Sequence, residues 1–299
     1  METKKTIKNK IDFAVVMAVE HANPNGDPLN GNRPRQTYDR FGEISDVCLK
    51  RKIRNRLLDM GASIFVQSDD KRRDDFRSLN ERFDSAQREN KNLDIRMWTC
   101  EKWLDVRLFG QLFAFKKKDA KKKDDGSEDT GAVSIGIRGP VTIQSAYSLD
   151  EVVVDSTQIT KSVNLETDKK NPDKRGADTM GMKHRIVKGV YVAYGSINTQ
   201  LASLTGVTDD DVALFQRALR SIFENDVSSA RPEGTMEVLK VVWWKHNCAT
   251  GQYSSARVHR ALKENIRKHN GSFDEDVVRN ALPGLEVEFL NQLEGVGLV

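Results

Sequence analysis

The strongest chemical signal in the chain is a run of five basic residues between positions 50 and 56. Phosphate groups need positive charge and N–H donors but no particular base, so such a run suits a polyanion. Three of these cations gather on one solvent-facing side of an expected helix: Lys50, Arg51 and Arg54. The acids of that helix, Asp46 and Asp59, lie at its ends, so we expect little internal pairing. The segment predicts a phosphate-binding surface, with an ordinary solvated face as the alternative.

A turn, NPNGDP, and an extended basic segment, GNRPRQ, precede this helix. Pro34 holds Arg33 extended, so Arg33 and Arg35 project to the same side and could contact one backbone. Structural ion pairs with nearby carboxylates are an equal alternative for both arginines. Asp27 could position a metal or activate a ribose hydroxyl, but a turn aspartate more often caps its own backbone. Because no second carboxylate or histidine lies at metal-ligand spacing, we expect no catalytic centre, no metal site and no cofactor.

A second candidate element is the motif MGMKHR, at residues 180–185. Exposed methionines beside cations could form an apolar wedge between bases, and both Met180 and Met182 are candidates. Gap filling against the sheet is the alternative, and it is slightly favoured for Met182. Contact with anions is favoured for Lys183 and Arg185. We expect His184 to be a hydrogen-bonding partner rather than a metal ligand or a base.

Hydrophobic patterns predict the elements that position these residues. The helix at 46–60 has Ser45 as its N-cap and Gly61 at its end, and an apolar stripe faces the sheet: Leu49, Ile53, Leu57 and Met60. A second helix, at 208–226, begins with a capping box from Thr208 to Asp211. We expect strands at residues 11–20, at 135–145 with a break at Gly139-Pro140, at 151–154, at 186–197 and at 236–245.

Charged segments interrupt these elements. Residues 69–94 are densely charged and are expected to be a helical excursion over the surface. The aromatic stretch at 98–115 should return to the core, where all four tryptophans are expected to pack: Trp98, Trp103, Trp243 and Trp244. The lysine-rich stretch at 116–131 is almost free of apolar groups and predicts a flexible loop. A polar insertion follows at 157–185, between two strands of the sheet.

The composition limits the possible classes of protein. Of the 299 residues, 38% are hydrophobic and 31% charged, and the net charge of +4 is small, so attraction to an anion must come from local clusters. Three scattered cysteines without a CxxC pair support neither a disulfide framework nor a zinc site. The first ten residues contain no apolar run and no apolar stretch approaches 18 residues, so we expect neither a leader nor a membrane span. We expect a reduced, cytoplasmic protein without a membrane partner.

The order of elements predicts an α+β fold, a single domain built on a split βαβ or ferredoxin-like antiparallel sheet with helices on one face. Several blocks then carry a resemblance in the right order: NPNGDP, GNRPRQ, ISDVCLKRKIRN, DVRLFG, IRGPVTIQSAYS and MGMKHRIVKGVYVAYGSIN. Together they resemble the backbone subunit of a type I CRISPR surveillance complex (Cascade), within the RAMP superfamily. The type I-C branch is the most similar.

The resemblance implies an RRM-like palm with a finger insertion at 62–131 and a thumb at 157–185. In such proteins, copies stack head to tail as a helical filament on one guide RNA (crRNA), which the thumbs kink and which pairs with target DNA in antiviral defence. Other Cascade subunits are further expected partners. Carried over by position, the expected RNA-binding residues are Arg33, Arg35, Lys50, Arg51, Arg54, Arg138, Gln144 and Ser145. From the MGMKHR motif, Lys183, His184 and Arg185 are expected to bind RNA as well.

Two alternatives to this non-catalytic scaffold remain at the level of sequence. One is an endoribonuclease of the same superfamily, which would cut guide precursor or target RNA through Asp27 or His184. The NPNGDP surroundings of Asp27 match the type I pattern, whose backbone subunits are not nucleases. The other alternative is a protein-binding module whose charges serve solubility alone.

Overall fold

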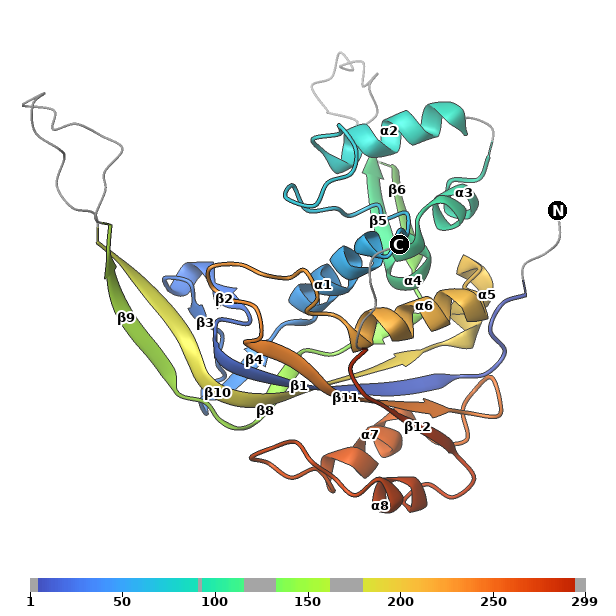
Figure 1. The fold of residues 1–299 in the computed structure, drawn as a ribbon. Coiled ribbons are helices and arrows are strands. Elements are labelled where there is room, and N and C mark those ends of the chain that lie inside the picture. The colour runs from blue at the N-terminus through green and yellow to red at the C-terminus, as the bar shows by residue number, and fades with distance from the viewer. Residues whose placement is uncertain (1–4, 91–92, 116–132, 162–179, 294–299) are drawn as a thin grey trace, which may run out of the picture.

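The computed structural model describes residues 5–90, 93–115, 133–161 and 180–293, and Figure 1 shows its fold. The strands are β1 (Ile11–Ala22), β2 (Gly26–Asp27), β3 (Arg33–Pro34), β4 (Phe41–Ile44), β5 (Gly110–Phe115), β6 (Val133–Arg138), β7 (Val141–Ile143), β8 (Ala146–Glu151), β9 (Val154–Thr160), β10 (Met180–Ile197), β11 (Met236–Lys245) and β12 (Glu286–Leu290). The helices are α1 (Asp46–Asp59), α2 (Leu79–Glu89), α3 (Ile95–Lys102), α4 (Leu104–Phe109), α5 (Thr199–Thr205), α6 (Asp209–Arg220), α7 (Ser255–Lys263) and α8 (Glu275–Asn280), with a short 3-10 turn at Pro28–Asn30.

The protein has a mixed α/β architecture that is built on one large antiparallel sheet. Within the described residues this sheet has eight strands in the order β12-β11-β1-β10-β8-β4, and β7 and β9 also pair with β10. The pairing of β1 with β10 runs from Ile11 opposite Ile197 to Ala22 opposite Ile186. Two small sheets, β2-β3 and β5-β6, lie outside it. The central strands β1, β10 and β11 therefore organise the fold.

Both faces of the central sheet are covered, because β1 is apolar on both sides. Phe13 and Met17 pack with α1 and α6 in one buried cluster, whereas Ala14 and Val16 pack with α7 and α8 in another. Figure 1 shows these two pairs of helices on opposite sides of the strands. The expectation of helices on one face is therefore wrong. A continuous apolar run such as Ile11–Glu20 is typical of a strand that is buried on both faces.

Most of the expected elements are present. The helix from Asp46 begins at its predicted N-cap Ser45, and the capping box of Thr208 and Asp211 is formed. The strands around Gly139-Pro140 divide as expected into β6 and β7. Helix α6, however, ends at Arg220, well before the predicted residue 226.

Residues 65–113 build an aromatic cluster of their own. Phe65, Phe83, Trp98, Trp103 and Phe113 are all buried there, around α2, α3, β5 and β6. The expectation that this stretch returns to the main core is therefore only partly right. Helix α4 connects the two clusters. Its Val106 packs in the aromatic cluster, whereas Leu104 and Leu108 pack in the main core.

Beyond the sheet, β9 and β10 continue as a two-stranded ribbon from Ile186, opposite Val154, to Met180, opposite Thr160. Figure 1 shows this ribbon projecting away from the helices. Residues 162–179 of the expected 157–185 insertion lie outside the described residues, and so does the expected loop at 116–131. Among the helices in the described ranges, none has the length and apolar character needed to cross a membrane.

Candidate nucleic-acid interface

The turn at residues 23–27 fixes the start of α1. The side-chain oxygen of Asn25 accepts hydrogen bonds from both the backbone N–H and the hydroxyl of Ser45, each at 2.9 Å. Ser45 in turn caps the helix by accepting from the N–H of Cys48 at 3.3 Å. Ser145 accepts from the N–H of Asp46, also at 3.3 Å. These bonds satisfy N–H groups at the start of the helix, and they connect α1 to both the turn and the β7-β8 connection.

The three predicted cations of α1 have different environments. Lys50 pairs with Asp46 one turn earlier at 3.0 Å, and both side chains stay partly exposed. Arg51 is exposed and has no ion pair or side-chain hydrogen bond within the described residues. Arg54 donates to the carboxylate of Asp105 at 3.0 Å, with side-chain exposures of 14% and 1%. The expectation that Arg54 stays on a solvated face is wrong, because α4 supplies a buried carboxylate that the helix itself lacks.

Two further cations of the run are buried, which the sequence analysis missed. Lys52 pairs with Asp226, and burial lowers the pKa of this lysine. Arg56 donates to the hydroxyl of Ser221 at 2.8 Å. A signal was available for Arg56, since it lies seven residues after Leu49 and therefore on the apolar stripe of the helix. Positive charge in this run is thus divided between structural and accessible positions.

The basic segment after the turn is also divided. Arg35 donates to the Asp27 carboxylate at 3.3 Å, so the ion-pair alternative holds for this arginine. Arg33 is exposed, and its guanidinium donates to the hydroxyl of Ser156 on β9 at 3.1 Å. Asp27 accepts from the N–H of Leu29 at 3.3 Å, which confirms the expected backbone cap. The segment therefore connects the turn with the β9-β10 ribbon.

One face of the ribbon presents both methionines. Met180, Met182 and His184 alternate along β10 and so share a face, whereas Lys183 and Arg185 lie on the other. Met180 is 67% and Met182 54% exposed, so the expectation that Met182 fills a gap against the sheet is wrong. The ribbon extends beyond the sheet, so within the described part of the chain no face of the sheet covers Met182.

The polar side chains of the ribbon have nearby partners. The ring Nδ1 of His184 lies 2.8 Å from the Ser156 hydroxyl, as expected for a hydrogen-bonding histidine. Arg185 pairs with Asp155 across the strands at 2.9 Å. Because Ser156 also contacts Arg33, it links the methionine face of the ribbon to the basic segment after the turn.

The remaining predicted residues lie in separate places. Ser145 is brought to the start of α1, as described above, and Gln144 is exposed beside it, with its N–H bonded to the carbonyl of Tyr194 at 2.8 Å. Arg138 is exposed at the end of β6, opposite Gly110 in the small β5-β6 sheet. The structure thus groups Ser145 with α1 and places Arg138 on a different sheet.

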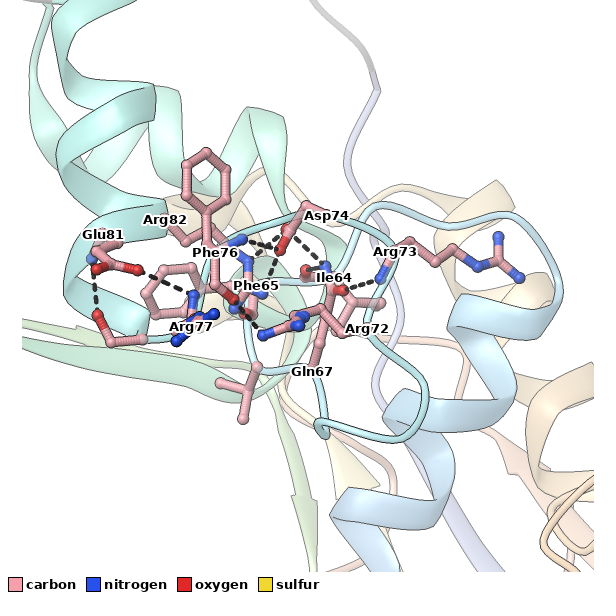
Figure 2. Close-up of polar contacts among 12 residues, drawn as sticks. Ile64, Phe65, Gln67, Arg72, Arg73, Asp74, Phe76, Arg77, Glu81 and Arg82 are labelled. Carbon is pink, nitrogen blue, oxygen red and sulfur yellow. Dashed lines mark hydrogen bonds and ion pairs between the residues drawn. The ribbon is translucent and has the colours of Figure 1, made fainter.

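Figure 2 shows a polar network that holds the loop before α2. The buried guanidinium of Arg82 donates twice to the Asp74 carboxylate, at 2.7 and 2.8 Å, and once to the Phe65 carbonyl at 2.8 Å. The hydrogen bonds from Arg82 help to hold the pKa of Asp74 below its usual value. The side chain of Gln67 accepts from the N–H of Arg73 at 2.9 Å. The network leaves three arginines exposed on this loop, none of which the sequence analysis selected: Arg72, Arg73 and Arg77.

The described residues bring no three histidine, cysteine or acidic side chains together in a way that could hold a metal ion. Asp27 and His184, the two residues of the endoribonuclease alternative, contact different partners, Arg35 and Ser156. The accessible side chains of α1, of the basic segment and of the ribbon present positive charge and apolar surface to a ligand.

Residues 9–280 match the family model described as "CRISPR-associated protein Cas7", and the chain belongs to this family. A relative from Haloferax volcanii, "CRISPR-associated protein Cas7", is 29% identical over 227 residues. That alignment covers 72% of this chain and 66% of the relative, so slightly less than two thirds of the relative's length is represented.

Two solved structures are also similar to this chain. The first, "CRISPR RNA-guided surveillance complex, pre-nicking", is 14% identical with a TM-score of 0.48, and the similarity covers 91% of this chain and 87% of that one. The second, "CRISPR RNA-guided surveillance complex", is 15% identical with a TM-score of 0.47, covering 97% and 91%.

Proposed function

We propose that the protein is a crRNA-binding backbone subunit of a CRISPR effector complex of the Cascade kind, from the type I-C branch. The observation that carries this proposal is the match of residues 9–280 to the Cas7 family. The geometry adds a cationic helix start, a basic segment and a ribbon with exposed methionines, which are joined through Asn25, Ser45 and Ser156. Such a surface suits a sugar-phosphate backbone with bases beside it.

We infer that the core is RRM-like and belongs to the RAMP superfamily. Its support is the strand order β11-β1-β10-β8, with α1 following β1 and α6 preceding β11, since a βαββαβ unit of the ferredoxin type has this arrangement. Residues 62–131 would be the finger and residues 157–185 the thumb. Both sheet faces are covered by helices, so bound RNA would follow the edge and the ribbon rather than the sheet surface.

Among the expected RNA-binding residues, Arg33, Lys50 and Arg51 become the leading ones. Arg54 and Arg35 would stabilise the fold of the site rather than contact RNA directly, since each is paired with a carboxylate. Further contacts would come from the other predicted RNA-binding residues: Arg138, Gln144, Ser145, Lys183, His184 and Arg185. Met180 and Met182 would form the wedge that kinks the guide.

The subunit would be non-catalytic, and Asp27 supports this, because its carboxylate already caps the backbone and pairs with Arg35. Copies would stack head to tail in a helical filament along one guide RNA, with other Cascade subunits at the ends. Target DNA would be recognised through the guide, in the cytoplasm. Base pairing by the guide requires a protein grip that does not depend on sequence, and phosphate contacts provide one.

Charge reversal on α1 tests this function. The double variant Lys50→Glu/Arg51→Glu should weaken binding of a labelled single-stranded RNA by tenfold or more at low salt, equally for unrelated sequences. Loss of two phosphate contacts should also lower the slope of log affinity against log salt by about 1.4.

A matched control is Arg260→Glu/Lys263→Glu on α7, which lies on the opposite face of the sheet and should bind RNA like the wild type. Equal affinity and slope for the α1 variant and the wild type would contradict the assignment of α1. Absence of RNA binding by the wild type at low salt would contradict the function itself and favour the protein-binding alternative.

A further inference from the structure

The chain contains three Asn-Gly pairs, at residues 25–26, 30–31 and 270–271. In such a pair the backbone nitrogen of the glycine can attack the side-chain carbonyl carbon of the asparagine, because glycine has no Cβ to shield its nitrogen or to restrict its backbone. The reaction requires both groups to be free to approach each other. The surroundings of each pair therefore decide which of the three can react.

The first pair is held by the start of α1. The side-chain oxygen of Asn25 accepts two hydrogen bonds from Ser45, each at 2.9 Å, and the backbone carbonyl of Asn25 accepts from the N–H of Arg35 at 3.0 Å. Gly26 is confined as well, since a Cβ at this position would lie 2.0 Å from the side-chain oxygen of Asn32. The side chain of Asn25 therefore cannot turn toward the nitrogen of Gly26 without breaking hydrogen bonds.

The third pair is held by its own loop. The side-chain oxygen of Asn270 accepts from the N–H and the hydroxyl of Ser272, at 3.0 and 2.8 Å. The N–H of Gly271, whose nitrogen would have to attack, donates to the carbonyl of Arg267 at 3.0 Å. A Cβ at Gly271 would lie 2.8 Å from a side-chain carbon of Val190, so this glycine is also closely packed. Both reacting groups of the pair are engaged.

The middle pair differs in each respect. Asn30 is the last residue of the exposed 3-10 turn at Pro28–Asn30, and its side chain has no hydrogen-bond partner within the described residues. Apart from its chain neighbours, Gly31 has no atom within 4 Å of the place where a Cβ would lie. Both residues are exposed to solvent. The two reacting groups are thus free to meet, and water can reach the product.

We propose that Asn30-Gly31 is a site of spontaneous deamidation in the folded protein, whereas the fold protects the other two pairs. The nitrogen of Gly31 loses its proton to solvent and forms a bond to Cγ of Asn30, and the side-chain nitrogen leaves as ammonia. Water then adds to either carbonyl carbon of the resulting succinimide and opens it to aspartate or isoaspartate. The reaction changes no oxidation state and consumes only water.

The modification places a negative charge in the basic segment. Position 30 lies three residues before the exposed Arg33, so the separation along the chain is at most about 11 Å. A carboxylate at this distance repels phosphate groups that Arg33 attracts, and in water the expected loss of RNA affinity is about twofold. This consequence rests on the proposed RNA-binding function, but the deamidation itself does not.

Peptide mapping by mass spectrometry tests the site after the folded protein has been incubated in water enriched in heavy oxygen. Digestion in ordinary water leaves any deamidation during sample preparation unlabelled. We expect Asn30 to gain heavy oxygen at least about tenfold faster than Asn25 or Asn270, because a misplacement of about 1 Å can slow such a reaction about 10²-fold. In the chain unfolded with urea, the three pairs should react at similar rates. Asn30→Gln should remove the fast reaction.

The effect on binding is measured with two variants that differ in charge alone. Asn30→Asp should bind labelled single-stranded RNA about twofold more weakly than Asn30→Gln.

Equal labelling of the three pairs in the folded protein would overturn the proposed site, and so would no labelling at Asn30 under conditions in which the unfolded chain reacts. Equal RNA affinity of Asn30→Asp and Asn30→Gln would overturn the consequence for binding. If the wild type binds no RNA, the proposed function fails, whereas the labelling pattern still decides the deamidation site.

Discussion

Helix α1 and the β9-β10 ribbon are both rich in positive charge, yet the structure uses that charge differently. In α1, three of the five cations have partners from other parts of the chain: Lys52, Arg54 and Arg56. In the ribbon, the partners lie on the facing strand and the pairs are largely solvated, as with Arg185 and Asp155. Ion pairs and hydrogen bonds of these three cations hold α1 against the neighbouring elements, whereas the cations of the ribbon stay partly exposed to solvent.

The difference teaches that charge density in a sequence does not measure charge that is available to a ligand. A helix packed against a sheet has a buried stripe and two flanks, and cations on the flanks meet whatever the neighbouring elements supply. In the described residues, the ribbon beyond the sheet is paired mainly across its own two strands, apart from the contact of Ser156 with Arg33. Exposed apolar side chains are therefore more informative there, and Met180 and Met182 are such side chains.

For helix α1, the largest effect is expected on stability, from Asp105→Ala. This carboxylate pairs with Arg54 and also accepts from the N–H groups of Phe65 and Val66, at 2.7 and 3.1 Å. Its loss leaves the partly buried guanidinium of Arg54 and two N–H donors without this acceptor. We expect the free energy of unfolding to fall by about 3–5 kcal/mol in urea titrations. Asp276→Ala, at an exposed pair on α8, should change it by less than about 0.5 kcal/mol.

A pair of arginine variants on the same helix should separate stability from binding. Arg54→Gln should lower the free energy of unfolding by about 1–3 kcal/mol and leave the RNA affinity of the folded protein within about twofold. Arg51→Gln should do the reverse, with about 0.5 kcal/mol or less in stability and a several-fold loss in RNA affinity. Urea unfolding and fluorescence anisotropy measure the two quantities. The same ranking in both assays would contradict the division of charge proposed for α1.

On the ribbon side, Met180→Ala/Met182→Ala should change the free energy of unfolding by about 0.5 kcal/mol or less, because both side chains are exposed. A wedge between bases would unstack them, so RNA that contains 2-aminopurine should fluoresce less with the variant than with the wild type. Ile159→Ala is the control, since this exposed residue lies on the opposite face of the ribbon. Equal 2-aminopurine fluorescence with the wild type, the methionine variant and Ile159→Ala would contradict the proposal that the two methionines form a wedge.

The smallest effect is expected at Asp27. Labelled RNA incubated with magnesium and the wild-type protein should stay intact, and Asp27→Asn should leave that result unchanged. The substitution keeps an oxygen that can accept from the N–H of Leu29, so the fold should tolerate it. Cleavage by the wild type that disappears in the variant would restore the endoribonuclease alternative.

Local features of the fold could be predicted from the sequence. Ser45 as a cap, the capping box of Thr208 and Asp211, and the break at Gly139-Pro140 each depend on residues a few positions apart. The burial of the tryptophans followed from their apolar neighbours. Such signals act within one element, so a single sequence contains them.

Features that depend on distant partners could not be predicted in this way. Arg54 and Asp105 are separated by 51 positions, and Lys52 and Asp226 by 174. The second helical layer was missed because α7 and α8 are short, at nine and six residues. The exposure of Met182 depends on how far the ribbon extends beyond the sheet, which periodicity does not reveal.

Strand β10 has a mechanical consequence. Along one edge its 18 residues pair with β9 as far as the fully buried Ile186, where pairing with β1 begins along the other edge. At about 3.3 Å per residue, the strand spans roughly 60 Å without a break. A load on Met180 would therefore be transmitted along the continuous backbone of β10 into the centre of the sheet. Because β10 is continuous from the buried Ile186 to Met180, we expect substitutions in the core around Ile186 to change where the two methionines lie.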